Sequence, residues 1–432
     1  MYIMKEYQKC AEEMLEFIRK SPTAFHAVAN IKTELENSGF AELKETESWE
    51  LESGKDYYVT RNDSSLIAFR IPELTEPVGF HIAASHSDSP GFKVKESPEM
   101  AVEGAYLKLN TEKYGGMILS TWLDRPLSVA GRIAVQEENR ISTRLVNIQE
   151  DLLVIPNLAI HMNSDANKGM EYKAQVDMLP LYADCEDGET EGMLMGRIAQ
   201  AAGVSPEDIL GHDLFLYTRQ EGRIFGEKGE FMLSPRLDDL ECVYTSVRGF
   251  LESRPEKYMN VCAVFDNEEV GSGTKQGANS TFLEDVLWRI CESLEYGRSD
   301  FLRMIAGSFL ISADNAHAVH PNHPEKADPT NRPYLNRGIV IKFHGSQKYA
   351  TDALSAAEMK RICREADVPF QTYANHSDIA GGSTLGNIST SHVSVSSVDI
   401  GIPQLAMHSA VETAGVKDVK YALDAFRVFF GA

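Results

Sequence analysis

Histidine, aspartate and glutamate side chains follow apolar, strand-like runs at five places in the sequence. The first place is His86-Ser87-Asp88, directly after the run from Val78 to Ser85. An aspartate two residues after a histidine can hold the imidazole ring and fix its tautomer, as metal-binding histidines require. Alone, the pair is weak evidence, because a single histidine is more often a structural or surface residue.

The second place is an acidic turn, Asp266-Asn267-Glu268-Glu269, after the run from Val261 to Phe265. Two adjacent glutamates can divide the work of hydrolysis, one binding a metal ion and the other moving protons on the attacking water. The residue types leave open which glutamate has which role, and a solvated acidic loop is the simpler alternative. The segment from Gly271 to Lys275 lacks the spacing of a phosphate-binding loop, which argues against nucleotide binding.

The other three places have ordinary explanations when each is taken alone. Asp238 and Asp239 could cap a helix, and His408 could be a core histidine after an apolar segment. The segment from Asp314 to His323 is less ordinary, because it holds three of the 12 histidines of the chain together with an aspartate.

Taken together, the five segments predict a metal site built from imidazole and carboxylate ligands. Zinc accepts such a set of nitrogen and oxygen ligands, and no cysteine is needed. Manganese or cobalt could occupy the same geometry. Five protein ligands, one of them a bridging carboxylate, suit a centre in which two metal ions activate one water molecule.

Strands and helices must alternate around these segments to bring them together. The predicted helices cover Met4–Arg19, Ala27–Asn37, Thr281–Leu294, Asp352–Glu365 and Val416–Phe429. The predicted strands cover Tyr57–Tyr58, Leu66–Ile71, Val78–Ser85, Asn260–Phe265, Ser308–Ser312, Gly338–Phe343 and Val393–Ile400. This alternation favours an α/β sheet layered with helices, in which functional residues gather beyond the carboxyl ends of the strands.

Between about Gly91 and Pro235 the pattern changes to short alternating runs separated by turns, which predicts a β-rich module. One helix is expected inside it, from about Ser205 to Leu210, with Ser205 as the N-cap. We therefore predict an α/β catalytic domain formed by residues 1–91 plus 236–432, and an inserted β-rich domain of residues 92–235.

The composition limits the class of protein. The 432 residues include 64 acidic and 42 basic side chains, a net charge of −22, and 43% are hydrophobic, as in a folded globular protein. The excess of negative charge argues against a partner with a phosphate backbone. No apolar stretch is long enough to span a membrane, and the first residues do not form a secretory signal. The six cysteines are scattered without a CxxC pair, so we expect no disulfides and a cytoplasmic location.

Nine motifs in a fixed order make the chain resemble the aspartyl aminopeptidase family of two-zinc metallo-aminopeptidases, as a bacterial member. The motifs are SPTAFH, HSDSPGFKVK, TWLDRPLSVAGR, IPNLAIHMN, SPRLDDL, FDNEEVGS, DNAHAVHPNH, GGSTLG and PQLAMHS, and they extend over nearly the whole chain. The resemblance implies a phosphorylase/hydrolase-like layered α/β catalytic domain with an inserted β-rich domain. It also implies two zinc ions per subunit and a hydrolase that removes the first residue of peptides.

Carried over residue by residue, the resemblance implies five metal ligands: His86 and Asp314 on one zinc, Asp238 as the bridge, and Glu269 and His408 on the second zinc. Glu268 would be the general base, which takes a proton from the attacking water and hands it to the leaving amine. Asp88 would orient His86 without binding metal.

Two further residues are expected to contact the substrate. Lys342 lies in the apolar run GIVIKF, where a buried ammonium is costly unless it meets an anion; the alternative is a lysine that extends to solvent from a strand end. The resemblance implies that Lys342 lines the substrate pocket, where it could pair with a substrate carboxylate. It also implies a tetrahedral homododecamer in which His161, from the insertion, reaches the active site of a neighbouring subunit. The remaining histidines of the fourth segment are expected to shape the pocket or to be structural: His317, His320 and His323.

The chain departs from the family pattern in two places. Asp239 stands where relatives often have asparagine, which adds a negative charge near the metals. The segment from His376 to Ala380 contains no arginine, whereas relatives commonly carry one in or near it.

The sequence therefore predicts a zinc-dependent aminopeptidase that releases N-terminal aspartate or glutamate. The missing arginine leaves a neutral, leucine-like preference as one alternative. A deacylase or carboxypeptidase on the same scaffold is another, and a non-catalytic assembly protein is a third.

Overall fold

The computed structural model describes residues 2–73, 78–185, 190–379, 381–382 and 384–432. The chain divides into two compact units. The first unit comprises Met1–Asp88, Gly222–Met407 and Glu412–Ala432, and the second comprises Ser89–Glu221 and His408–Val411. These boundaries differ from the predicted 92–235 insertion, because residues 223–234 pair into a sheet of the first unit and residues 408–411 belong to the second.

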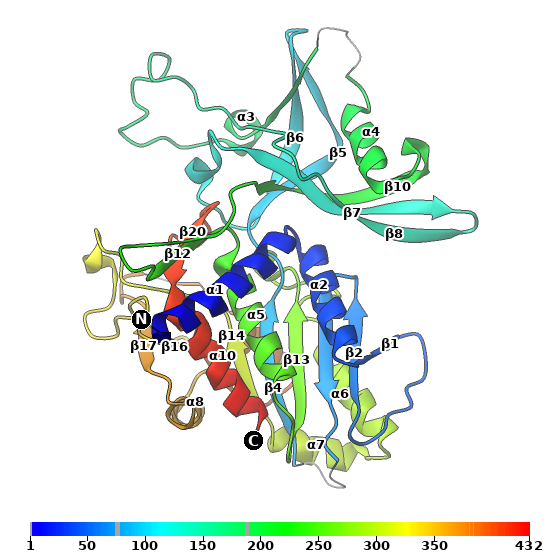
Figure 1. Cartoon of the computed structure of the whole chain (residues 1–432), viewed down its shortest axis with the longest axis vertical. Helices are drawn as coiled ribbons and strands as arrows, with labels where there is room; N and C mark the ends of the chain where they lie inside the picture. The colour runs from blue at the N-terminus through cyan, green and yellow to red at the C-terminus, as the bar shows by residue number, and fades with distance from the viewer. Residues whose placement is uncertain (1, 74–77, 186–189, 380, 383) are drawn as a thin grey trace. The chain divides into compact units, whose positions relative to one another are not determined.

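A nine-stranded mixed sheet forms the centre of the first unit (Figure 1). In spatial order its strands are β1 (Ala41–Leu43), β2 (Asp56–Arg61), β3 (Ser65–Arg70), β13 (Met259–Phe265), β4 (Phe80–His86), β14 (Phe309–Ala313), β18 (Ser396–Gly401), β16 (Ile339–Phe343) and β17 (Phe370–Ala374). The neighbours β13, β4 and β14 run parallel. Every residue of β13 and β4 is buried, which explains why both strands read as continuous apolar runs in the sequence.

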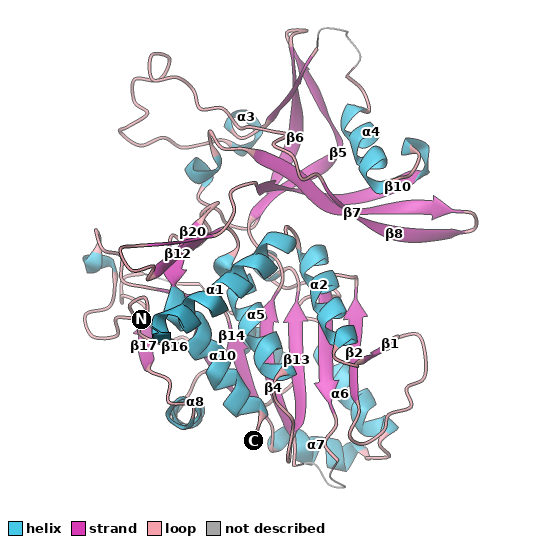
Figure 2. Cartoon of the chain, in the orientation of Figure 1, coloured by secondary structure: helices cyan, strands magenta, loops and turns pink. Residues whose placement is uncertain are grey.

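Helices pack against both faces of this sheet, as the secondary-structure view in Figure 2 shows. Alternate residues of β4 point to opposite faces: Ala83 belongs to one hydrophobic cluster, and Ile82 and Ala84 belong to another. The first cluster includes residues of α1 (Tyr2–Lys20), α2 (Ala24–Asn37), α5 (Leu237–Leu251), α8 (Ala353–Glu365) and α10 (Val416–Phe430). The second includes residues of α6 (Phe282–Ser293), α7 (Arg298–Ala306) and α9 (Leu385–His392).

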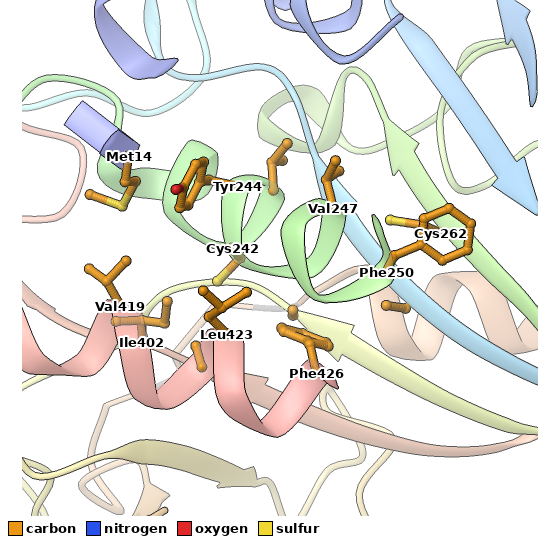
Figure 3. Packing of buried hydrophobic residues seen from close by; sticks show 14 of the residues in the cluster. Met14, Cys242, Tyr244, Val247, Phe250, Cys262, Ile402, Val419, Leu423 and Phe426 are labelled. Carbon is orange, nitrogen blue, oxygen red and sulfur yellow. The ribbon is translucent and has the colours of Figure 1, made fainter. Parts of the chain in front are cut away.

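Helix α5, whose first turn contains Asp238 and Asp239, is held in place by its packing against α10. Figure 3 shows Cys242 of α5 pointing toward α10 close to Leu423, and Leu240, Val243, Val247 and Phe250 of α5 belong to the same hydrophobic cluster as Val419, Leu423 and Phe426 of α10. A Cβ atom at Gly249 would come within 2.4 Å of Phe426 Cβ, so the close approach of the two helices requires glycine there. The position of α5 is therefore fixed by close packing along its length.

A five-stranded sheet completes the first unit, in the order β11 (Arg223–Phe225), β12 (Phe231–Ser234), β20 (Glu412–Gly415), β19 (Pro403–Leu405) and β15 (Ala316–His317). The second unit contains an antiparallel sheet in the order β8 (Arg140–Asn147), β7 (Leu127–Glu137), β10 (Ile209–Thr218), β5 (Gly91–Val102), β6 (Tyr106–Tyr114) and β9 (Leu181–Asp184). It also holds the helices α3 (Ala174–Asp177) and α4 (Met193–Ala202). The β-rich texture predicted for this part of the sequence is confirmed.

One predicted element is wrong. Ser205 to Leu210 does not form an α-helix: a three-residue 3₁₀ turn spans Pro206–Asp208, and Ile209 and Leu210 begin β10. Ser205 makes no side-chain capping hydrogen bond. Pairing of β10 with β7 along its length outweighs the local helix signal.

The other predicted helices and strands are present, with ends shifted by a few residues. The helices α3, α4, α5, α7 and α9 were not predicted. All six cysteines are buried and free of disulfides, as expected. Among the helices of the described residues, none combines the length and apolarity needed to cross a bilayer.

Candidate metal centre

The three parallel strands at the middle of the large sheet end at one edge. Phe265 of β13 lies beside His86 of β4, and Ser312 of β14 lies beside Ala84 of the same strand. The residues that follow β13 and β14 therefore emerge next to His86. In a parallel arrangement this edge collects the residues that bind ligands.

Four buried side chains meet there. His86 Nε2 lies 3.4 Å from Asp238 Oδ1, 4.0 Å from Asp239 Oδ2 and 4.0 Å from Asp314 Oδ1. One ligand atom from each of the four residues lies within 4.8 Å of the others, and a second such group is formed by His86, Glu268 and Glu269. Of the residues predicted to bind metal, four thus come together in the first unit: His86, Asp238, Glu269 and Asp314.

The start of α5 delivers the aspartate pair to this edge. Arg236, at the N-cap, has a left-handed backbone (φ 55°), and its guanidinium donates to the backbone oxygens of Ile18 and Ser21 at the end of α1. Asp238 N donates to Glu412 Oε2 at 3.1 Å. Asp239 Oδ2 accepts from His86 N at 3.1 Å, so the second aspartate holds the backbone of the histidine.

Asp88 holds both the histidine and the acidic turn. The backbone oxygen of Asp88, which can only accept, lies 3.0 Å from His86 Nδ1. Nδ1 therefore carries a proton, and Nε2 is the nitrogen that faces the aspartates. The two carboxylate oxygens of Asp88 accept from Glu268 N at 3.1 Å and from Glu269 N at 3.2 Å. This contact fixes the turn that carries both glutamates.

Burial and like charge shift the titration of these groups. Burial raises the pKa of Glu268, His86 opposes the rise, and the carboxylates of Asp314 and Asp238 add to it, so that the pKa is about 7. Burial also raises the pKa of Asp239 and of Asp314. For His86, burial lowers the pKa, but the surrounding aspartates outweigh it and the pKa lies well above its ordinary value.

The donor set fits a divalent cation. One imidazole nitrogen and several carboxylate oxygens converge in a buried space, and the negative charges of the carboxylates repel one another unless a cation lies among them. Nitrogen and oxygen donors of this kind are those that zinc takes in catalytic sites. His86, Asp238 and Asp314, with Glu269, are the side chains that would hold it.

Lys342 is buried beside the aspartates. It is 2% exposed, its Nζ donates to the backbone oxygen of Asn315 at 2.8 Å, and it lies 3.8 Å from Asp314 Oδ2. Burial lowers the pKa of Lys342, but Asp314 and other nearby groups raise it above its ordinary value, so the ammonium is charged. The lysine does not extend to solvent from its strand.

Two predicted residues belong to the second unit. His408 has a left-handed backbone (φ 64°), and its Nδ1 lies 2.5 Å from the backbone oxygen of Gly116. Nδ1 therefore carries a proton, as in His86. His161 lies in an exposed turn next to the exposed residues Ile160 and Met162.

The other histidines of the Asp314–His323 segment stay outside the ligand groups found among the described residues. His317 lies on β15, with its ring 6.2 Å from that of Tyr373. The rings of His320 and His323 lie 5.3 Å apart in an exposed loop. Ala380 and Ser383, which belong to segments compared with the family, lie outside the described residues.

Sequence reasoning missed three buried polar residues at the site. Glu412 accepts from Asp238 N, and Asn315 and Glu241 bond to each other behind the aspartates. Asn315 had one signal, its position next to Asp314. Nothing in the local sequence singles out Glu241 or Glu412.

Comparison with known proteins gives one consistent result. Residues 17–430 match the family described as "Aminopeptidase I zinc metalloprotease (M18)". The chain is 51% identical to "Probable M18 family aminopeptidase 2" of Clostridium novyi (strain NT), over 99% of this chain and 100% of that protein. Among solved structures, "Cryo-EM structure of the Ape4 and Nbr1 complex" is 37% identical, with a TM-score of 0.95, over 99% of this chain and 86% of that chain. "Structure of S. cerevesiae mApe1 dodecamer" is 27% identical, with a TM-score of 0.86, over 98% of this chain and 97% of that one.

Proposed function

Because this chain belongs to the M18 family of zinc aminopeptidases, we propose that it releases N-terminal acidic residues from peptides at the edge where β4, β13 and β14 end. The observation that carries the proposal is the convergence of His86, Asp238 and Asp314 with the Glu268–Glu269 turn at the ends of parallel strands. Both a ligand set and a separate carboxylate for proton transfer are present.

Five residues would hold two zinc ions: His86 and Asp314 the first, Asp238 both, and Glu269 and His408 the second. When bound, the metal supplies a polarised substrate carbonyl and an acidified water. Cobalt or manganese could replace zinc with the same donor set. The hydrogen bonds of His86 and His408 suit this assignment, because in each ring Nδ1 faces a backbone oxygen and Nε2 is left for a metal ion.

Glu268 would be the general base. Its carboxylate would accept the proton of the attacking water and then donate it to the amine that leaves. A pKa of about 7, raised by burial, suits both steps near neutral pH. Asp88 would keep this carboxylate in place through its bonds to the backbone of the turn.

The base assignment is tested by Glu268→Gln, which keeps the shape of the side chain and removes its proton-accepting oxygen. We expect kcat on a peptide that begins with Asp to fall by about 10²–10⁴-fold while the zinc content, measured by mass spectrometry, stays at the wild-type level. Glu227→Gln, at an exposed position, is the matched control. Near-normal turnover in Glu268→Gln would show that another group moves the proton.

Lys342 supports the acidic preference. Its charged ammonium lies 3.8 Å from Asp314 Oδ2, and we propose that it pairs with the side-chain carboxylate of a bound residue. The test compares kcat/KM for peptides that begin with Asp, Glu, Leu or an acetylated residue, with and without a chelator, in the wild type and in Lys342→Met. Chelator-sensitive release of Asp and Glu, lost in the variant, supports the proposal. Preferred release of Leu would move the specificity, cleavage only of the acetylated peptide would indicate a deacylase, and no cleavage with any metal would indicate an assembly protein.

The first unit would be a phosphorylase/hydrolase-like catalytic domain and the second an inserted oligomerisation domain. We propose a tetrahedral homododecamer in which His161 reaches a neighbouring subunit; the similar protein mApe1 of S. cerevesiae is described as a dodecamer. The exposed apolar residues around His161 suit burial against another copy. Light scattering should give about 12 times the 48.0 kDa chain mass, and a monomer would rule the assembly out.

We propose a cytoplasmic location, because six buried thiols free of disulfides suit a reducing compartment.

A further inference from the structure

Asn315 lies at the centre of a buried polar network in the first unit. It is 2% exposed. Its Nδ2 donates to Glu241 Oε2 at 3.1 Å and to Gln404 Oε1 at 2.9 Å. Its Oδ1 accepts from Cys242 Sγ at 3.1 Å, and its backbone oxygen accepts from Lys342 Nζ at 2.8 Å. The partners of this one residue come from α5, β19 and β16.

The bond between Asn315 and Glu241 joins two segments that carry candidate metal ligands. Asn315 directly follows Asp314, and Glu241 follows Asp238 by three residues on α5. The two aspartate oxygens approach the same His86 Nε2, at 3.4 Å from Asp238 and 4.0 Å from Asp314. The spacing of these two ligands therefore depends on how α5 and the end of β14 are held together.

We infer that Asn315 is a positioning residue, which sets the spacing of Asp314 and Asp238 for metal through its hydrogen bond to Glu241. The inference rests on the proposed function, because it needs those aspartates to bind metal. Metal–oxygen distances are tightly constrained, near 2.0–2.2 Å for zinc, so a small shift between the two segments weakens binding. Hydrogen-bond partners of metal ligands typically change metal affinity by about 10–100-fold when they are replaced.

The chemistry of the network explains why an amide is needed at this position. The two N–H groups of Asn315 face two oxygens, those of Glu241 and Gln404, while its own oxygen faces the Cys242 thiol. An aspartate in the same place would have the same shape but would turn a carboxylate toward the carboxylate of Glu241, which is fully buried. The amide hydrogen bond that joins the two segments would then be lost, with two oxygens in its place.

The same chemistry predicts a rescue. In the double variant Asn315→Asp with Glu241→Gln, the new amide on α5 can donate to the new carboxylate, so the hydrogen bond returns with its direction reversed and the charge of the pair is unchanged. Gln404 can turn its amide to donate as well, because its Nε2 has no hydrogen-bond partner among the described residues. Rescue of this kind depends on the specific bond and not on general stability.

The experiment measures zinc affinity of the full-length protein by competition with a chelator, and the visible absorption spectrum of the cobalt-loaded protein. We expect Asn315→Asp to lower zinc affinity by about 10–100-fold and to change the cobalt spectrum. The zinc affinity of the double variant should recover to within about threefold of the wild-type value. The effects of substitutions at two directly bonded residues do not add, so the second substitution can restore what the first removes.

The matched control is Asn260→Asp. Asn260 is equally buried and donates to the backbone oxygen of Phe430, but it lies near the start of β13, away from the strand ends that carry the site. We expect it to lower the thermal midpoint without changing the cobalt spectrum. Wild-type zinc affinity in Asn315→Asp, equal losses in Asn260→Asp, or a double variant no better than the single would each overturn the inference. Failure of the proposed function is separate: the wild-type protein would then bind no zinc or cleave no peptide.

Discussion

One aspartate can hold two parts of a site when its side-chain oxygens and its backbone oxygen accept hydrogen bonds from different partners. Asp88 does this: its backbone oxygen accepts from His86 Nδ1, and its side-chain oxygens hold the backbone of Glu268 and Glu269. The two functions are separable by mutation, because a change in the side chain leaves the backbone oxygen in place.

We therefore predict that Asp88→Asn lowers kcat more than it lowers metal binding. The new NH₂ group cannot accept from a backbone N–H, so one of the two bonds to the acidic turn is lost and Glu268 is no longer held in position. We expect kcat to fall by about 10–100-fold, since misplaced catalytic groups typically cost about that much, while bound zinc stays at the wild-type level. Asp63→Asn, at an exposed position, is the control, and loss of zinc with unchanged kcat per bound ion would contradict the argument.

At the scale of single residues, the sequence indicated which side chains would come together better than it indicated their hydrogen-bond partners. His86, Glu269 and Asp314 follow apolar strands, so local sequence marks them as strand-end residues. Glu412 reaches Asp238 from 174 residues away in the chain, and such contacts leave no local signal. Asp239 was expected as a helix cap or as an extra charge near the metals, whereas it holds the backbone of His86.

At the scale of single elements, β4 connects two different environments. Its carboxyl end carries His86, and its amino end carries His81, which packs under α10. The His81 ring stacks on Tyr258 at 3.7 Å and on Phe429 at 4.6 Å, and its Nδ1 lies 2.9 Å from the backbone oxygen of Phe429. The strand that carries His86 is thus packed, near its amino end, through the titratable ring of His81.

We predict that this ring makes stability depend on pH. Burial lowers the pKa of His81 from 6.5 to about 4, and the nearby Glu358 and Arg361 act on it in opposite directions. Below pH 6.5 His81 binds a proton in the unfolded chain but stays neutral in the folded chain. The stability that the neutral ring contributes is therefore fully present above pH 6.5 and is lost as the pH falls toward 4. Between pH 7 and 5 this amounts to about 2 kcal/mol.

The measurement is the free energy of unfolding in urea at pH 7 and pH 5. In His81→Phe, which keeps the stacked ring and cannot titrate, the loss between the two pH values should be smaller than in the wild type by about that amount. His323→Phe, at an exposed histidine, should leave the loss unchanged. Equal losses in the wild type and His81→Phe would show that His81 titrates alike in the folded and unfolded chains.

Elements with strong periodicity were predictable and short ones were not. The strand over Met259–Phe265 has a clear apolar pattern, and the helix over Ala353–Glu365 has one as well, together with an N-cap at Asp352. The helix predicted after Ser205 failed because strand pairing across the sheet of the second unit decides the structure of Ile209 and Leu210. The whole of α5 was also missed, and at its start Asp238 and Asp239 have non-helical backbone angles that place them at the site.

For the molecule as a whole, folding brings negative charge together. The chain has a net charge of −22, and Asp238, Asp239 and Asp314 lie buried around one histidine. Gathering these carboxylates costs free energy, which a cation among them offsets. Metal binding at this site would therefore be coupled to folding, since the unfolded chain has no preformed site.

This coupling gives a count of the bound ions. If two zinc ions bind the folded subunit, its free energy of unfolding should rise by about 2.7 kcal/mol for each tenfold increase in free zinc above the dissociation constants; for one ion the rise is about 1.4 kcal/mol. The measurement uses urea unfolding at fixed protein concentration in zinc buffers. Cysteines exposed by unfolding also bind zinc and reduce the slope, so the double variant His86→Asn with Asp238→Asn serves as the reference. The difference between the two slopes isolates the native site, because both chains share the same cysteines. A difference near 1.4 kcal/mol would reject the two-ion centre, and no difference would show that His86 and Asp238 do not hold zinc in the folded chain.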